Sequence, residues 1–173
     1  FFNSFFIFLL APVFAWLWTT MGRRGIEPST PVKFGLGVGL AGLGFGALVM
    51  GAASPNEAGL VIGYWMVLAY LLHTAGELCL SPVGLSAVTK LSVPGVVGVM
   101  MGAWFLATAY SQHVAAQLSK LAAIDANSGA ADVATALATY TDLFTNLLYV
   151  GLGVAVLQFL LSPLLKKMMY GIH

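Results

Sequence analysis

The sequence predicts an all-α integral membrane protein with five transmembrane helices, and three observations support this. The 173-residue chain is 60% hydrophobic and only 8% charged, whereas a soluble domain carries about 25% charged residues. It contains five long apolar runs, and a helix needs about 20 such residues to cross a bilayer. Its basic residues gather in alternate connections between these runs, as they do on the cytoplasmic side of membrane proteins.

The first two predicted spans are separated by a charged turn. The run 3–21 contains Pro12, which we expect to kink the helix or to free a backbone carbonyl. The turn MGRRGIEPSTPVK follows, with two prolines as helix breakers. The second span, 33–53, is very rich in glycine and alanine. Glycines four residues apart permit close helix packing in membranes, and in this span they are Gly35/Gly39 and Gly42/Gly46.

The remaining three spans are approximately 59–90, 95–117 and 142–165. The third contains Glu77, the only acidic residue buried in a predicted span, and the turn KLSVPG separates it from the fourth. A longer polar connection precedes the fifth span, which ends at a proline followed by two lysines. Two further pairs of this kind are Gly59/Gly63 and Gly98/Gly102. The glycines predict that the second and fourth spans are crowded by neighbouring helices.

The charges predict the orientation of the chain, because alternate connections lie on the same side of the membrane. Six of the seven cations share one side: Arg23, Arg24, Lys33, Lys90, Lys166 and Lys167. The other side holds Lys120 with four acids, Glu57, Asp125, Asp132 and Asp142. The positive-inside rule then places Phe1 outside and the C-terminus in the cytoplasm, in the inner or plasma membrane of the cell. We expect a longer protein, because Phe1 is not an initiating methionine and a preceding span is required.

Several function classes are excluded by composition. A net charge of +1 offers no basic patch for nucleic acid. The single Cys79 excludes an internal disulfide framework and a cysteine-based zinc site. The sequence has no metal-ligand cluster, no nucleophile with a plausible base and no phosphate-binding loop. We therefore expect no catalytic residues, no bound metal and no enzyme activity.

Glu77 is the strongest candidate for a functional residue. A charge at the bilayer centre is unfavourable by about 2.5–3.5 kcal/mol on insertion scales. Lys90 is thirteen residues later, roughly 20 Å along a helix. The partner of Glu77 is therefore a proton, the ammonium of a ligand, or a cation on helices outside this chain. The alternative is a protonated structural glutamate that is hydrogen-bonded to a neighbouring helix.

Three other candidate residues, two polar and one aromatic, lie in the third and fourth predicted spans. His73 is one turn before Glu77, where it either shares a proton with Glu77 or is a neutral interior residue. Ser81 is one turn after Glu77 and either binds substrate or bonds to its own helix. Trp104 is too deep for an interfacial belt, so it either lines a pocket or gate or packs in the core.

Three segments resemble one transporter family. GELCLSPVGLSAVTKL (76–91) strongly resembles the tenth-helix motif of the proton-dependent oligopeptide transporters, which belong to the major facilitator superfamily. FNSFFIFLLAPVFAWLW (2–18) and VGVMMGAWFLATA (97–109) are similar to the eighth and eleventh helices. The resemblance implies that the chain is helices eight to twelve, most of the C-terminal six-helix bundle of a major facilitator fold, and that the N-terminal half is absent.

The resemblance also implies a function for the full-length protein, namely uptake of di- and tripeptides by alternating access with protons as the coupling ion and no other cofactor. Its partners would be the peptide, the lipid bilayer and the missing N-terminal half. By position, Glu77 matches the acid that receives the peptide amino terminus, and Ser81 and Trp104 match a hydroxyl and an aromatic wall of the pocket. Asn3 matches an asparagine that binds the peptide backbone, although Ser4 stands where the family commonly has proline.

Three alternatives to peptide transport stay open at this point. Another major facilitator carrier, such as a drug/proton antiporter or a nitrate carrier, would also place an acidic residue in its pathway. An intramembrane enzyme would need more than His73 and Glu77. A non-transporting membrane scaffold would tolerate the replacement of Glu77 by glutamine.

Overall fold

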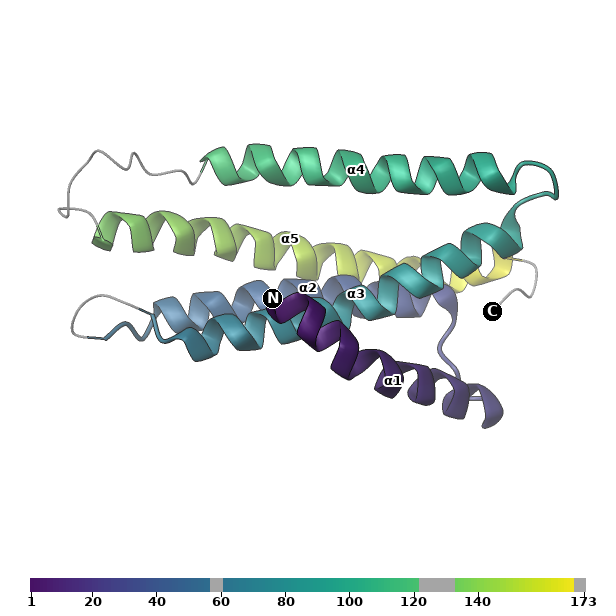
Figure 1. Ribbon diagram of the computed structural model, residues 1–173, viewed down its shortest axis with the longest axis horizontal. Coiled ribbons are helices and arrows are strands. Elements are labelled where there is room, and N and C mark those ends of the chain that lie inside the picture. Colours follow the sequence, from purple (N-terminus) through teal and green to yellow (C-terminus); the bar gives the residue numbers. More distant parts are fainter. Residues whose placement is uncertain (57–60, 122–132, 170–173) are drawn as a thin grey trace.

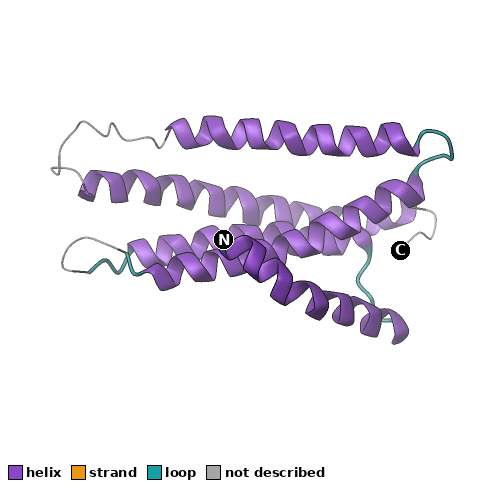
Figure 2. Ribbon diagram, in the orientation of Figure 1, coloured by secondary structure: helices purple, strands orange, loops and turns teal. Residues whose placement is uncertain are grey.

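The computed structural model describes residues 1–56, 61–121 and 133–169, and within them every regular element is an α-helix (Figures 1 and 2). The five helices are α1 (Phe2–Arg23), α2 (Thr30–Ala52), α3 (Gly63–Leu91), α4 (Val97–Leu121) and α5 (Val133–Met168). Each helix corresponds to one predicted span. The all-helical, five-helix prediction is therefore confirmed for the described residues.

The largest difference from the predicted ranges is at the start of α5. The helix begins at Val133, whereas the predicted fifth span begins at 142. The added segment VATALATYT is short of charge and contains alanine and leucine, which favour helix formation. Helix α2 also begins earlier than predicted, because Pro31 lies in its first turn, a position where proline fits a helix. Residues 57–60, where the predicted third span begins, lie outside the described residues.

The helix α2 is central to the bundle. It packs against α3 on one side and α5 on the other, while α1 and α4 each contact α3. Figure 1 shows α2, α3 and α5 side by side, with α4 beyond α5 and α1 crossing α3. Glycines make two of the reversals: Gly25 after α1 and Gly95 before α4 have φ of 69° and 98°, where side chains are strained.

Two faces of α2 are made of glycine. The predicted pairs Gly35/Gly39 and Gly42/Gly46 both face α5, where they meet Phe159, Ala155, Gly151 and Leu148. A second row, spaced by seven residues, faces α3 and consists of Gly37, Gly44 and Gly51. The predicted crowding is thus present for α2. It is absent at Gly98 and Gly102 of α4, where a Cβ would find no atom of the described residues within 4 Å.

Four of the five helices in the described part of the chain are long and apolar enough to cross a membrane, namely α1, α2, α3 and α5. The exception, α4, carries six polar side chains among the ten residues from Ser111 to Lys120 in its second half. Its 25 residues nevertheless run nearly parallel to α5 in the view of Figure 1, although its helix contacts within the described chain are with α3. The five helices therefore fit the multi-pass membrane protein that composition predicted.

Candidate functional site

Glu77 lies at the middle of α3, fourteen residues from either end of the helix. Its carboxylate accepts a hydrogen bond of 3.0 Å from the side-chain amide of Asn3 on α1. The same amide nitrogen lies 3.4 Å from the hydroxyl oxygen of Thr74. Asn3 and Glu77, both predicted from the sequence, are thus joined although 74 residues separate them.

Asn3 thus contacts two residues of α3, Thr74 and Glu77, and these two differ in burial. Thr74 is completely buried between helices, whereas the Glu77 side chain is exposed on the surface of the chain. Glu77 forms no ion pair with any of the described residues. A carboxylate held by one neutral amide and otherwise open is available to a cationic group from outside this chain.

Ser81 lies one turn after Glu77 on α3 and is also exposed. Trp104 lies further from the carboxylate. Its ring packs on Gly84, where a Cβ would come within 2.2 Å of the ring, and meets Phe34 edge-on at 6.5 Å between ring centroids. Gly84 is seven residues, roughly 10 Å, beyond Glu77 along α3. Trp104 therefore joins α4 to α2 and α3 at some distance from the Asn3–Glu77 pair.

His73 is turned toward α2. Its Nε2 lies 3.0 Å from the backbone oxygen of Ala41, and since a carbonyl can only accept, this nitrogen carries the proton. The ring also packs on Phe45, with 4.7 Å between centroids. Gly44 allows this approach, because a Cβ there would be 2.4 Å from Nε2. His73 thus has the hydrogen-bonded interior position that was one of its two predicted roles.

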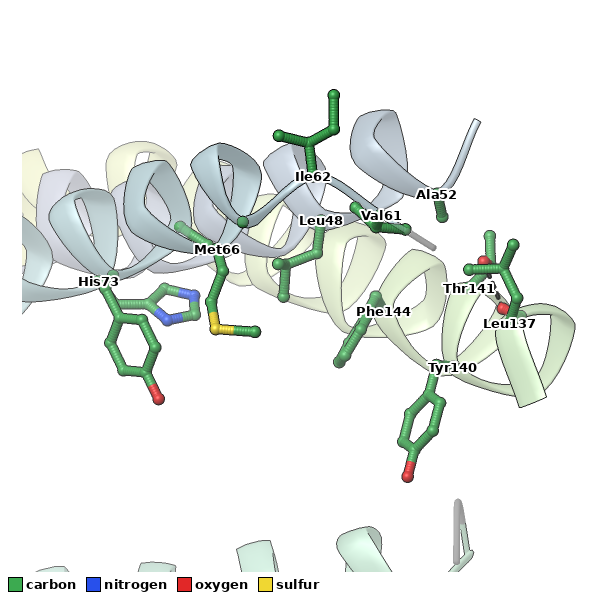
Figure 3. Close-up of a pocket in the computed structure, with 13 residues that line it drawn as sticks. Leu48, Ala52, Val61, Ile62, Met66, His73, Leu137, Tyr140, Thr141 and Phe144 are labelled. Carbon is green, nitrogen blue, oxygen red and sulfur yellow. Dashed lines mark hydrogen bonds between the residues drawn. The ribbon is translucent and has the colours of Figure 1, made fainter. Parts of the chain in front are cut away.

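A cavity of about 460 Å³ lies between α2, α3 and α5 (Figure 3). His73 lies at one end of it, and Leu137 of α5 at the other. The lining is almost entirely apolar and aromatic, including Met66, Tyr140 and Phe144. None of Asn3, Glu77, Ser81 and Trp104 lines this cavity, so it is separate from the predicted substrate-binding residues.

Two residues with specific polar contacts were missed in the sequence. Thr74 precedes Glu77 by three residues, a spacing that places both near one helix face, and that spacing was its only signal. Lys33 was counted among the cations of the first connection, at the boundary of the second predicted span, but it lies in the first turn of α2 and is only 6% exposed. It forms an ion pair with Glu27, and its Nζ lies 4.8 Å from the centroid of the Trp18 ring.

Comparison with known proteins relates this arrangement to one family. A model of the POT family (PTR2) matches residues 1–137. The chain is 49% identical over 119 residues to the uncharacterized transporter YclF of Bacillus subtilis (strain 168), an alignment that covers 69% of this chain and 24% of the relative. It is 35% identical over 170 residues to dipeptide and tripeptide permease B of Aliivibrio fischeri (strain MJ11), covering 96% of this chain and 34% of that protein.

A solved structure confirms the fold. The crystal structure of the peptide transporter POT in complex with sulfate matches with a TM-score of 0.82 and 35% identity, over 98% of this chain and 31% of that chain. The present chain therefore spans about a quarter to a third of the length of its relatives. The family model matches far more than half of the chain. This chain belongs to the POT family, as the three sequence motifs indicated.

Proposed function

We propose that the full-length protein takes up di- and tripeptides together with protons, by alternating access, and that this chain forms part of its C-terminal half. The observation that carries the proposal is the Asn3–Glu77 hydrogen bond at the middle of α3, on an exposed face of the chain. The names of the relatives support it, since they include a dipeptide and tripeptide permease and a peptide transporter.

The chemistry of the pair suits the amino end of a peptide. A carboxylate at the depth of the bilayer centre is stabilised by a cation, and a peptide brings its own ammonium. Binding then partly offsets the desolvation of both charges. Asn3 offers an amide beside the carboxylate, which suits the peptide backbone that follows the ammonium. Ser81 and Trp104 extend the proposed wall along α3 and α4.

The rest of the site would come from outside this chain. Carriers of this type bind substrate near the midplane, between two helical halves that rock about the site. Glu77, at the centre of a 29-residue helix, lies at the corresponding depth. Protons serve as the coupling ion in this proposal, and the protein lies in the inner or plasma membrane with the cationic end of the bundle in the cytoplasm.

Uptake by the full-length protein in proteoliposomes tests the proposal. We expect dipeptide uptake driven by an inward proton gradient, and loss of most uptake in Glu77→Gln, which keeps the shape of the side chain but removes its charge. Asp142→Asn is the matched control, because Asp142 is an exposed acid near the start of α5, away from the site. Absence of uptake of every dipeptide, or wild-type uptake by Glu77→Gln, would contradict the proposal. Proton-driven export of a cationic drug would instead favour an antiporter.

A further inference from the structure

The Asn3 amide makes two contacts with α3, and they use the same nitrogen. Nδ2 lies 3.0 Å from Oε2 of Glu77 and 3.4 Å from Oγ1 of Thr74. Peptide binding, as proposed above, gives roles to Asn3 and Glu77 but none to Thr74. Yet Thr74 is completely buried, and buried hydroxyls are placed where their hydrogen bonds are satisfied.

The chemistry of the three groups determines how the amide is turned. An ionised carboxylate only accepts hydrogen bonds, so the NH₂ end of Asn3 must face Glu77. That nitrogen has a second N–H, and the Thr74 oxygen has the lone pairs to accept it. With both N–H groups directed to α3, the remaining hydrogen-bonding atom of the amide is Oδ1, which is an acceptor.

One contact would not fix this orientation. The terminal torsion of asparagine is broad and roughly two-fold, so an amide held only by Glu77 can turn about that single hydrogen bond. The second contact, to an oxygen on a different turn of α3, fixes the plane of the amide. Because Thr74 is completely buried, packing fixes the position of its hydroxyl oxygen, and this fixed oxygen in turn orients the Asn3 amide.

We propose that Thr74 is a positioning residue that holds the Asn3 amide so that Oδ1 accepts a hydrogen bond from a backbone N–H of the bound peptide. The inference rests on the proposed function, because it takes the substrate to be a peptide bound at Asn3. It adds a preference among peptide substrates: the site favours, by the value of one hydrogen bond, a substrate with an N–H donor at the peptide bond next to the ammonium.

Two substrates that differ by one methyl group test this role in the full-length protein. Alanyl-alanine has the peptide N–H, whereas its analogue methylated on the peptide nitrogen lacks it; both keep the ammonium and the carboxylate. Thr74→Val preserves the branched shape and removes the hydroxyl. We expect it to raise KM for alanyl-alanine about three- to tenfold, the value of one neutral hydrogen bond, with kcat per transporter unchanged. KM for the methylated dipeptide should not change.

The matched control is Thr74→Ser, which keeps the hydroxyl and should leave both KM values near wild type. Asn3→Ala should raise KM for alanyl-alanine, and adding Thr74→Val to it should raise KM no further. An equal rise for both substrates, or no rise for either, would overturn the positioning role.

Should the valine variant not reach the membrane, Thr74→Ala, which adds no atoms, gives the same measurement. Failure of the wild type to take up alanyl-alanine would instead overturn the proposed function, and this inference with it.

Discussion

Lys33 is the most deeply buried charge among the described residues. Lysine is almost never fully buried unless it is paired, and here the residue is 6% exposed with Glu27 as its partner. The ring of Trp18 adds a cation–π contact, which is worth roughly 0.5–2 kcal/mol depending on desolvation. Together these contacts tie the end of α1, the turn after it and the first turn of α2.

Replacement of Lys33 by methionine should lower the apparent Tm of the full-length protein in detergent by about 1–2 °C. Methionine keeps the apolar stem but removes the ammonium. A loss of about 1 kcal/mol corresponds to about 2–4 °C in a domain of 150–250 residues and to about half of that in a chain twice as long. Lys33→Arg, which keeps the charge, is the control and should stay near the wild-type Tm. Trp18→Leu should lower Tm less in the Lys33→Met protein than in the wild type, and equal decreases would contradict the coupling.

The polar residues discussed above differ in whether the sequence alone could predict their roles. Glu77 could be predicted because a carboxylate inside an apolar run is rare and expensive. Thr74 could not, because its role depends on α1 crossing α3 at Asn3, 71 positions away in the chain. Lys33 was predicted at the boundary between the charged turn and the second span, because two prolines in that turn were interpreted as helix breakers. Pro31 instead fits the first turn of α2, so Lys33 lies inside the helix.

At the scale of elements, α2 shows what a four-residue glycine pattern predicts. The pairs beginning at Gly35 and Gly42 correctly predicted a packed face, but the pattern contains no information about which helix occupies it; the structure places α5 there. The second face, with glycines seven residues apart, contacts α3 and was not predicted, because a search for pairs four residues apart does not detect that spacing. The conformation of α2 was thus predictable, whereas its neighbours were not.

The contact between α2 and α5 predicts a difference between two glycines of the same helix. A Cβ at Gly151 would come within 2.9 Å of the Gly42 Cα, so Gly151→Ala must push the two backbones apart. We expect a loss of about 1–3 kcal/mol, the usual range for overpacking, seen as a lower Tm and a lower yield of folded protein. Gly153→Ala is the control, because no described atom lies within 4 Å and alanine favours helix. Similar behaviour of the two variants would contradict the packing.

The described part of the chain has a strongly apolar outer surface, which suits contact with lipid or with further helices. Large apolar side chains are fully or largely exposed on its outer helices, among them Phe8, Leu106 and Leu160. The candidate carboxylate Glu77 is exposed as well. The glycine pair of α4 indicates a packing surface, and nothing among the described residues covers it. The sequence could predict such surfaces, because long apolar runs, an acidic residue within one of them and glycines four residues apart are visible in it. It could not predict which lipid or protein groups cover them.

The charge distribution over the whole molecule predicts its orientation in the membrane. Successive helices alternate in direction, so the C-terminal ends of α1, α3 and α5 lie at one end of the bundle, to the right in Figure 1. The last turns of these helices carry Arg23, Lys90 and Lys167. The positive-inside rule predicts that this end of the bundle is the cytoplasmic end. Ser54, exposed in the turn after α2, lies at the opposite end.

Cysteine labelling in cells that express the full-length protein measures this orientation directly. A cysteine replacing Ser54 should react with a membrane-impermeant maleimide in intact cells, whereas one replacing Lys167 should react only after permeabilisation. The loss of one cation leaves five of the six in place, so the charge bias persists. Cys79 is 2% exposed and gives this chain an unreactive background, which the unsubstituted protein verifies.

Reversed accessibility would show that the charge bias does not set the orientation. Reaction of both positions in intact cells would contradict the alternating path of the helices, because Ser54 and Lys167 would then share one side of the membrane.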